Sequence, residues 1–189
     1  MTVVKFTRME DGDAIDFTLA ADLFDASRCV TGHVDAVFDQ LKTLLGDPIG
    51  YQVDRFEHSL QSASRALRDG RDEPYVVAAL LHDIGDTLAP HNHGDIAAGI
   101  LKPYVGEDVH FIIKNHALFQ GYYYWHLDGR DRNRNARERF RGHPHFEATA
   151  EFCEKYDQCS FDPNYPTLKL ADFDPIVRRV FAKPADWAC

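Results

Sequence analysis

The chain has 189 residues, of which 44% are hydrophobic and 27% charged, and its formal net charge is -9. This length is sufficient for one domain with a buried core. The negative charge argues against a general nucleic-acid-binding protein or a protein attached to anionic membranes, because both depend on a positive surface. We therefore expect a small-molecule partner, and the oligomeric state stays open.

Cysteine usage and the start of the chain indicate the compartment. Cys29, Cys153, Cys159 and Cys189 show no CxxC spacing, and the first ten residues lack the long apolar segment of a secretory signal. No stretch approaches the ~20 consecutive apolar residues that a membrane span needs. We expect a reduced, cytoplasmic protein without a membrane segment.

Apolar residues recur at helical spacing through most of the chain, and strand signals are scarce. Residues 1 to about 31 are mixed and weakly periodic, whereas the following helix stops at Gly46 and the next stops at Asp69-Gly70. The pattern predicts an all-α fold with one core. The expected helical segments are 34–45, 56–67, 74–85, 93–104, 109–116, 145–157 and 175–181.

Residues 120–144 differ from the rest because they combine a Tyr-Tyr-Tyr-Trp run with six arginines and have no dominant period. Loops of this length in a compact domain are commonly functional. We therefore interpret the segment as a long aromatic and arginine-rich loop or lid.

The adjacent His82 and Asp83 stand on the otherwise apolar run 78–85. Two such polar groups are costly to bury unless they are paired, and a metal ion is an economical partner. Cysteines do not cluster, so nitrogen and oxygen ligands are expected rather than a closed zinc or iron–sulfur site. The expected ligands are His58, His82, Asp83, His93, His116 and Asp172.

A carboxylate can bridge two metals through its two oxygens, so Asp83 is expected to be shared. One metal would be held with His58, His82 and Asp172, and the other with His93 and His116. The second metal would keep open positions for substrate, as catalysis requires. Taken alone, His93 is equally compatible with a structural role at a helix start.

The pattern of Glu57-His58, His82-Asp83-Ile84-Gly85, His93, His116 and Asp172 resembles the HD-domain superfamily, in its six-ligand dinuclear branch. The resemblance covers roughly residues 48–182. Its closest features, Ile49-Gly50, residues 57–61 and the short His93 to His116 interval, are similar to those of mixed-valence diiron oxygenases that cleave carbon–phosphorus bonds. It implies a single HD-domain helical bundle over 1–189, with residues 1–47 as an extension and covering helix.

For activity, the resemblance implies an Fe(II)/Fe(III) pair with O2 as co-substrate. A 1-hydroxyphosphonate would chelate iron through its hydroxyl and phosphonate oxygens, lose the hydrogen on the hydroxyl-bearing carbon, and be cleaved to release phosphate. Asp83, His93 and His116 would form the catalytic side of the site.

Four residues are expected to contact substrate. Lys169 is a candidate for the phosphonate, although an ordinary surface lysine is the alternative. Tyr51 replaces an acid of the aminoethylphosphonate relative and favours a trimethylammonium group, since cation–π attraction contributes ~2 kcal/mol when desolvated. Gln61 is expected to orient substrate or a ligand. Asp86 departs from a histidine of some relatives, which leaves the local phosphonate contacts open.

Three readings of function compete. The preferred one is the phosphonate oxygenase with the trimethylammonium substrate, and a primary amine is its variant. The same ligands also suit an HD-type phosphohydrolase that activates water against a phosphate ester. The third is a regulatory module in which the metal ligands are structural and residues 120–144 form the interaction surface.

Overall fold

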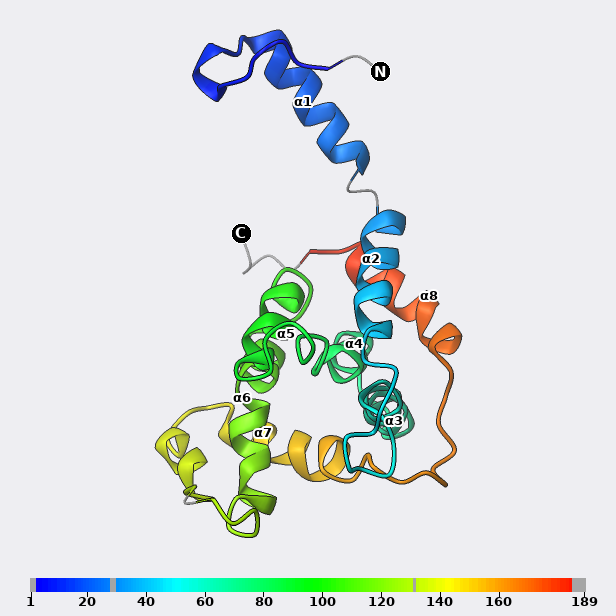
Figure 1. Ribbon diagram of the computed structural model, residues 1–189, viewed down its shortest axis with the longest axis vertical. Coiled ribbons are helices and arrows are strands. Elements are labelled where there is room, and N and C mark those ends of the chain that lie inside the picture. Colours follow the sequence, from blue (N-terminus) through cyan, green and yellow to red (C-terminus); the bar gives the residue numbers. More distant parts are fainter. Residues whose placement is uncertain (1–2, 28–29, 131, 185–189) are drawn as a thin grey trace.

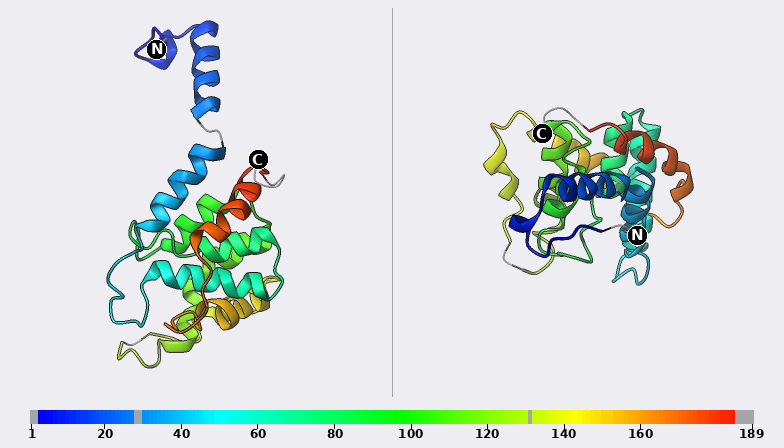
Figure 2. Two further views of the ribbon diagram at one scale, coloured as in Figure 1. Left: turned by 90° about the vertical axis from the view of Figure 1, so that its right-hand side faces the viewer. Right: turned by 90° about the horizontal axis from the view of Figure 1, so that it is seen from above.

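A computed structural model describes residues 3–27, 30–130 and 132–184, and it is all-helical (Figures 1 and 2). No strand occurs in these ranges, which confirms the predicted fold class. None of the helices in this part of the chain combines the length and apolar character needed to cross a membrane. Cys29 and Cys189 lie outside the described residues.

The helices α2 to α8 form a bundle, and α1 extends away from it at the top of Figure 1 and in the left view of Figure 2. Short helical turns η1 (Met9–Asp11), η2 (Ala136–Phe140) and η3 (Cys153–Asp157) connect or extend the helices. The bounds are α1 (Ala14–Ser27), α2 (Val30–Lys42), α3 (Arg55–Arg68), α4 (Glu73–Leu81), α5 (His93–Leu101), α6 (Glu107–Tyr124), α7 (Phe146–Phe152) and α8 (Leu170–Phe181).

The centre of the bundle is α4, in which every residue from Tyr75 to Leu81 is buried. A helix that is apolar on all sides is expected in such a position, because it has no face for solvent. It packs against α3, α6 and α8. The chain therefore leaves α4 at His82 inside the protein rather than at its surface.

Local sequence signals fix where α3 and α4 begin and end. The Asp54 carboxylate accepts the amide hydrogen of Glu57 at the start of α3, and Asp72 does the same for Tyr75 at the start of α4. Gly70 adopts φ +76° directly after α3, a left-handed conformation that glycine takes at little cost. The two helices are thereby joined by a short turn and pack along their length.

Most expected helices are confirmed, but three boundaries were wrong. The helix α6 continues to Tyr124, so the tyrosines expected in a loop belong to its last turn. The helix α8 begins at Leu170 rather than Pro175, because the Asp172 carboxylate accepts the backbone N–H of Lys169 and caps an earlier start. The helix α4 ends at Leu81, one residue before His82.

The helix α1 was not expected from the weak periodicity of the first 31 residues. The Asp13 carboxylate accepts the backbone N–H groups of Ile15 and Asp16, each at 2.9 Å, and so caps its first turn. This capping signal was present in the sequence, but no clear apolar face accompanied it.

The start of α5 lies close to α6 because position 94 is glycine. A Cβ atom there would lie 3.0 Å from the Lys114 carbonyl oxygen and 3.1 Å from that of Ile113. Both atoms belong to the α6 backbone and cannot move without disturbing that helix. The small residue therefore permits the approach that brings the first turn of α5 onto α6.

Two alanine substitutions in α5 test this packing. We expect Gly94→Ala to lower the free energy of unfolding by about 1–3 kcal/mol through overpacking. Gly99→Ala is the matched control, because a Cβ atom there meets nothing within 4 Å, and it should instead raise stability by about 0.5–1 kcal/mol. Urea midpoints measure both, and equal shifts of the same sign would contradict the close approach.

Candidate metal centre

Four histidines from four different parts of the bundle point toward one place. His58 lies in the second turn of α3, and His82 directly follows α4. His93 begins α5, and His116 lies in the middle of α6. His58, His82 and His116 are buried and His93 is half-buried, so the imidazoles meet inside the protein.

Each of these rings has its Nδ1 atom against a backbone carbonyl oxygen. A carbonyl oxygen can only accept, so Nδ1 carries the proton and donates it in every case. In the neutral form of such a ring the Nε2 atom on the other side is unprotonated, which is the form that binds metals. The Nδ1 partners are Ser160 at 2.9 Å from His58, Ala79 at 2.8 Å from His82, Pro90 at 3.3 Å from His93 and Ile113 at 2.6 Å from His116.

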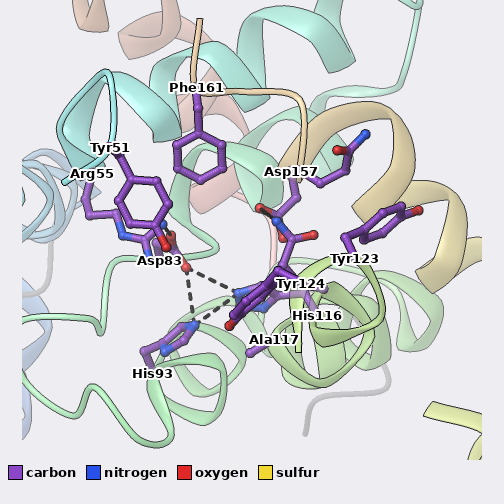
Figure 3. Close-up of a pocket in the computed structure, with 12 residues that line it drawn as sticks. Tyr51, Arg55, Asp83, His93, His116, Ala117, Tyr123, Tyr124, Asp157 and Phe161 are labelled. Carbon is purple, nitrogen blue, oxygen red and sulfur yellow. Dashed lines mark hydrogen bonds and ion pairs between the residues drawn. The ribbon is translucent and has the colours of Figure 1, made fainter. Parts of the chain in front are cut away.

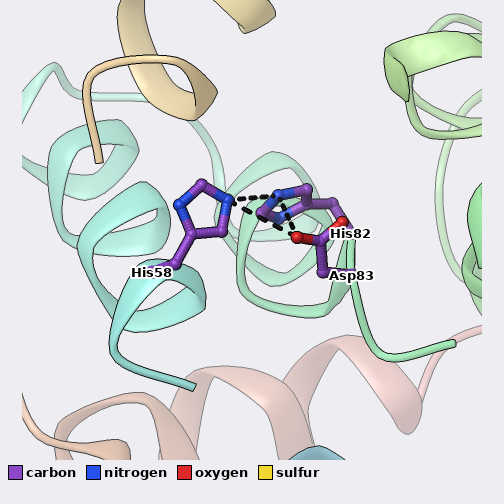
Figure 4. Close-up of side chains that lie close together, drawn as sticks. All are labelled: His58, His82 and Asp83. Carbon is purple, nitrogen blue, oxygen red and sulfur yellow. Dashed lines mark hydrogen bonds and ion pairs between the residues drawn. The ribbon is translucent and has the colours of Figure 1, made fainter. Parts of the chain in front are cut away.

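The Nε2 atoms face each other in two pairs. Those of His58 and His82 are 3.0 Å apart (Figure 4), and those of His93 and His116 are 3.2 Å apart (Figure 3). Two lone pairs at this distance repel unless a cation or a proton lies near both. This arrangement fits the expected role of these histidines as metal ligands. The Nδ1 hydrogen bonds fix the orientation of each ring and thereby direct the Nε2 atoms toward one another.

Asp83 lies between the two pairs and turns one oxygen toward each. Its Oδ2 atom is 3.5 Å from Nε2 of His58 and 3.5 Å from Nε2 of His82. Its Oδ1 atom is 3.2 Å from Nε2 of His116 and 3.3 Å from Nε2 of His93 (Figure 3). This geometry would allow Asp83 to bridge two cation sites, and the sharing of Asp83 between two metals stays a prediction.

A second buried carboxylate, Asp157, completes the cluster. Its Oδ1 atom is 3.4 Å from Nε2 of His58 and 3.9 Å from Nε2 of His82. Gln120 donates its amide hydrogen to the same oxygen at 3.0 Å. The Oδ2 atom is buried without a hydrogen-bond partner in the described part of the chain, as expected for an oxygen that faces a cation.

The expectation that Asp172 is the last ligand was wrong. Asp172 is exposed and its carboxylate caps the N-terminus of α8, so it is engaged by the backbone N–H of Lys169. Asp157 was missed, although the sequence carried a signal for it. It ends the apolar segment of Phe152, Cys153 and Tyr156, which are all buried, and an acid on such a face needs a partner.

The described residues contain three overlapping groups whose ligand atoms lie close enough to share an ion. All three combine imidazole nitrogen with carboxylate oxygen, the donor set that suits iron and other borderline metals. No cysteine belongs to any of these groups in the described ranges. The groups are His58, His82 and Asp83; His82, His116 and Asp157; and Asp83, His93 and His116.

The shifted pKa values of His82, Asp83 and Asp157 match this role, whereas the pKa of His116 is raised, because its contact with Asp83 outweighs the lowering effect of burial. Burial lowers the pKa of His82 to about 4, so its ring is neutral at pH 7. Burial tends to raise the pKa of Asp83, but neighbouring histidines and Arg55 outweigh burial and hold it well below its ordinary value. Burial also tends to raise the pKa of Asp157, but its contacts with His58, His82 and His116 together outweigh burial and lower it. Both carboxylates are therefore ionised.

A cavity of about 390 Å³ opens onto one half of the cluster (Figure 3). His93, His116 and both carboxylates line it, whereas His58 and His82 are fully buried behind it. One half of the cluster is closed and the other is open to a small molecule. The remaining lining residues are Tyr51, Arg55, Ala117, Gln120, Tyr123, Tyr124, Gln158 and Phe161.

Among the expected substrate contacts, Tyr51 lines the cavity. Its ring stacks on Phe161 at 4.8 Å, and the Arg55 guanidinium lies 5.1 Å from its centroid. Phe161 in turn stacks on the His58 ring at 4.3 Å. The faces of Tyr51 are therefore partly covered, so the ring offers a ligand less surface than the sequence suggested.

The other expected contacts lie elsewhere. Gln61 is buried and exchanges hydrogen bonds with the backbone of Asp162, so it holds the segment after η3. Lys169 is exposed at the start of α8 and does not line the cavity, which makes its expected role wrong. Asp86 lies behind the wall, 3.5 Å from Arg55 and 3.8 Å from Nδ1 of His93.

The metal content of two variants tests whether Asp157 or Asp172 is the metal ligand. We expect Asp157→Asn to lower the amount of metal retained after gel filtration, because the closed half loses a charged oxygen. Asp172→Asn should retain the wild-type amount and cost only about 1 kcal/mol of stability through the weaker cap. Elemental analysis of both variants decides the assignment. Loss of metal from Asp172→Asn alone would restore the sequence-based ligand set.

Comparison with known proteins agrees with this geometry. Residues 55–141 match the family model described as HD domain. This segment contains Asp83 and all four histidines of the cluster, but it ends before Asp157. No curated protein matches the chain. The match and the His/Asp cluster together indicate a metal-dependent enzyme. The described part of the chain is all-α, and its residues 55–141 are similar to HD domains.

Proposed function

We propose that this chain is a diiron oxygenase that uses O2 to cleave the C–P bond of a 1-hydroxyphosphonate. The observation that carries the proposal is the Asp83 carboxylate, which presents one oxygen to the closed pair His58 and His82 and the other to the open pair His93 and His116. Two linked metal positions, one shielded and one facing a cavity, suit a reaction in which substrate binds at the second.

Iron is the proposed cofactor because the ligand set is imidazole and carboxylate, and because the HD-type pattern resembles mixed-valence diiron oxygenases. When bound, an Fe(II)/Fe(III) pair supplies the redox chemistry with O2. The protein supplies fixed ligands, since each imidazole is oriented by a backbone carbonyl. Gln120 orients Asp157 in the same way through its amide.

The preferred substrate is (R)-1-hydroxy-2-(trimethylammonio)ethylphosphonate, which yields glycine betaine and phosphate. Tyr123 and Tyr124 give the cavity an aromatic wall opposite Tyr51 (Figure 3), and aromatic faces attract a quaternary ammonium. The lining acids Asp83 and Asp157 both face imidazoles. A primary ammonium, as in 1-hydroxy-2-aminoethylphosphonate, would prefer a carboxylate that is not engaged in this way.

The second candidate is an HD-type phosphohydrolase. The same two metal positions can activate water against a phosphate ester, and the HD domain match agrees with either chemistry. The two reactions differ in their need for O2, which makes them separable by one assay.

Reconstitution tests the proposal. The protein is loaded with Fe(II) without oxygen, then given O2 and a panel of 1-hydroxyphosphonates and phosphate esters. We expect phosphate release from a hydroxyphosphonate with equimolar O2 uptake, and faster release from the quaternary amine than from the primary one. Phosphate from an ester under anaerobic conditions would establish the hydrolase, and a faster primary amine would reverse the substrate assignment.

A substitution at His116 separates catalysis from a structural metal site. We expect His116→Ala to lower turnover more than about 100-fold, since even residues behind metal ligands contribute 10–100-fold, with only a modest shift in the unfolding midpoint. His91→Ala is the control, because His91 is exposed just before the start of α5 and belongs to none of the ligand groups in the described residues. If His116→Ala greatly lowers stability and the unsubstituted protein shows no measurable turnover, the regulatory module would be favoured.

A further inference from the structure

Arg55 is the single lysine or arginine among the described residues that line the metal cavity. It is the first residue of α3, and its side chain is 28% exposed. The six arginines of the 120–144 segment are not among the lining residues, although Arg132 and Arg139 line a neighbouring cavity. Any anionic group that enters the metal cavity therefore meets one fixed positive side chain.

The contacts of Arg55 within the protein are long for hydrogen bonds. Its Nη1 atom is 3.5 Å from Oδ2 of Asp83, and its Nε atom is 3.5 Å from Oδ2 of Asp86. A charged N–H···O bond is normally ~2.7–2.9 Å. The guanidinium carries five N–H donors in a planar fork, so it retains capacity for an oxyanion.

Metal binding would increase that capacity. The Asp83 Oδ2 atom that faces Arg55 is also the oxygen that faces His58 and His82. If Oδ2 of Asp83 ligates a cation, the cation neutralises part of its negative charge. The electrostatic attraction between Asp83 and Arg55 then weakens. A half-buried guanidinium then gains from a second anion in the cavity.

Aromatic packing holds the guanidinium in position. Its Cζ atom lies 5.1 Å from the centroid of Tyr51 and 5.9 Å from that of Phe161, and these two rings stack on one another (Figure 3). The stack continues to the His58 ring. Arg55 is therefore fixed relative to the metal ligands, which favours recognition of an oxyanion that bridges metal and guanidinium.

We propose that Arg55 binds the anionic group of the substrate, the phosphonate in the proposed reaction, beside the metal pair. The inference rests on the proposed two-metal site, but it does not depend on oxygen chemistry. Arg55 would also orient the substrate in the cavity. A cationic amine would be repelled from the Tyr51 and Phe161 side by Arg55 and would lie toward Tyr123 and Tyr124 on the opposite wall.

Binding of inorganic phosphate to the iron-loaded protein, measured anaerobically by calorimetry, tests this assignment. We expect Arg55→Gln to bind phosphate at least 10-fold more weakly while keeping the wild-type iron content, and Arg55→Lys to recover part of the affinity. Arg65→Gln is the matched control on the same helix. Arg65 stacks on Tyr165 at 3.9 Å and donates to the Cys159 carbonyl, away from the metal cavity.

Two results would overturn the proposal. Unchanged phosphate affinity in Arg55→Gln would mean that the metals alone hold the anion. Loss of iron from Arg55→Gln would mean that the residue acts by holding Asp83 rather than by binding substrate. Neither result depends on C–P cleavage, so a protein that lacks oxygenase activity but shows Arg55-dependent phosphate binding would sink the proposed function and leave this inference intact.

Discussion

The carboxylate of Asp83 is the group on which the site depends. It is buried, ionised and placed between two pairs of imidazoles whose Nε2 atoms face one another. Removing its charge would leave no carboxylate that touches both pairs of imidazoles, since Asp157 lies on the side of His58 and His82. The bundle holds this arrangement because α4 is buried on all sides and delivers His82 and Asp83 directly into the interior.

The backbone contributes as much to the centre as the ligands do. Four carbonyl oxygens fix the protonated side of four rings, and three of these carbonyls lie three residues before the histidine that they orient. Such local pairs follow from helix and turn geometry. The fourth carbonyl, at Ser160, lies 102 residues from His58, so the segment after η3 must fold against α3 for that ring to be set.

The sequence predicts the parts of this protein that local chemistry determines. Apolar periodicity and capping residues predict the positions of α2 to α7, although not the ends of α4 and α6, and the His82-Asp83 pair on an apolar run predicts a buried site. The apolar segment before Asp157 indicates only that this acid needs a partner, and neither that partner nor the role of Arg55 could be assigned this way, because both depend on contacts with residues far along the chain. The predictions for Asp172 and Lys169 were wrong for a local reason. These residues form a capping pair at the start of α8, and the three-residue spacing of such a pair is also typical of two site residues on one helical turn.

Asp157 reaches the cluster from a turn that is wider than an α-helix. In η3 the N–H of Gln158 bonds to the Cys153 carbonyl oxygen at 2.9 Å, a five-residue step that accommodates one extra residue. Shortening this turn by one residue would restore regular winding and rotate the residues beyond the deletion by about 100°. The Asp157 carboxylate would then no longer face the histidine cluster. The number of residues between Phe146 and Asp157 is therefore itself required for the metal centre to form.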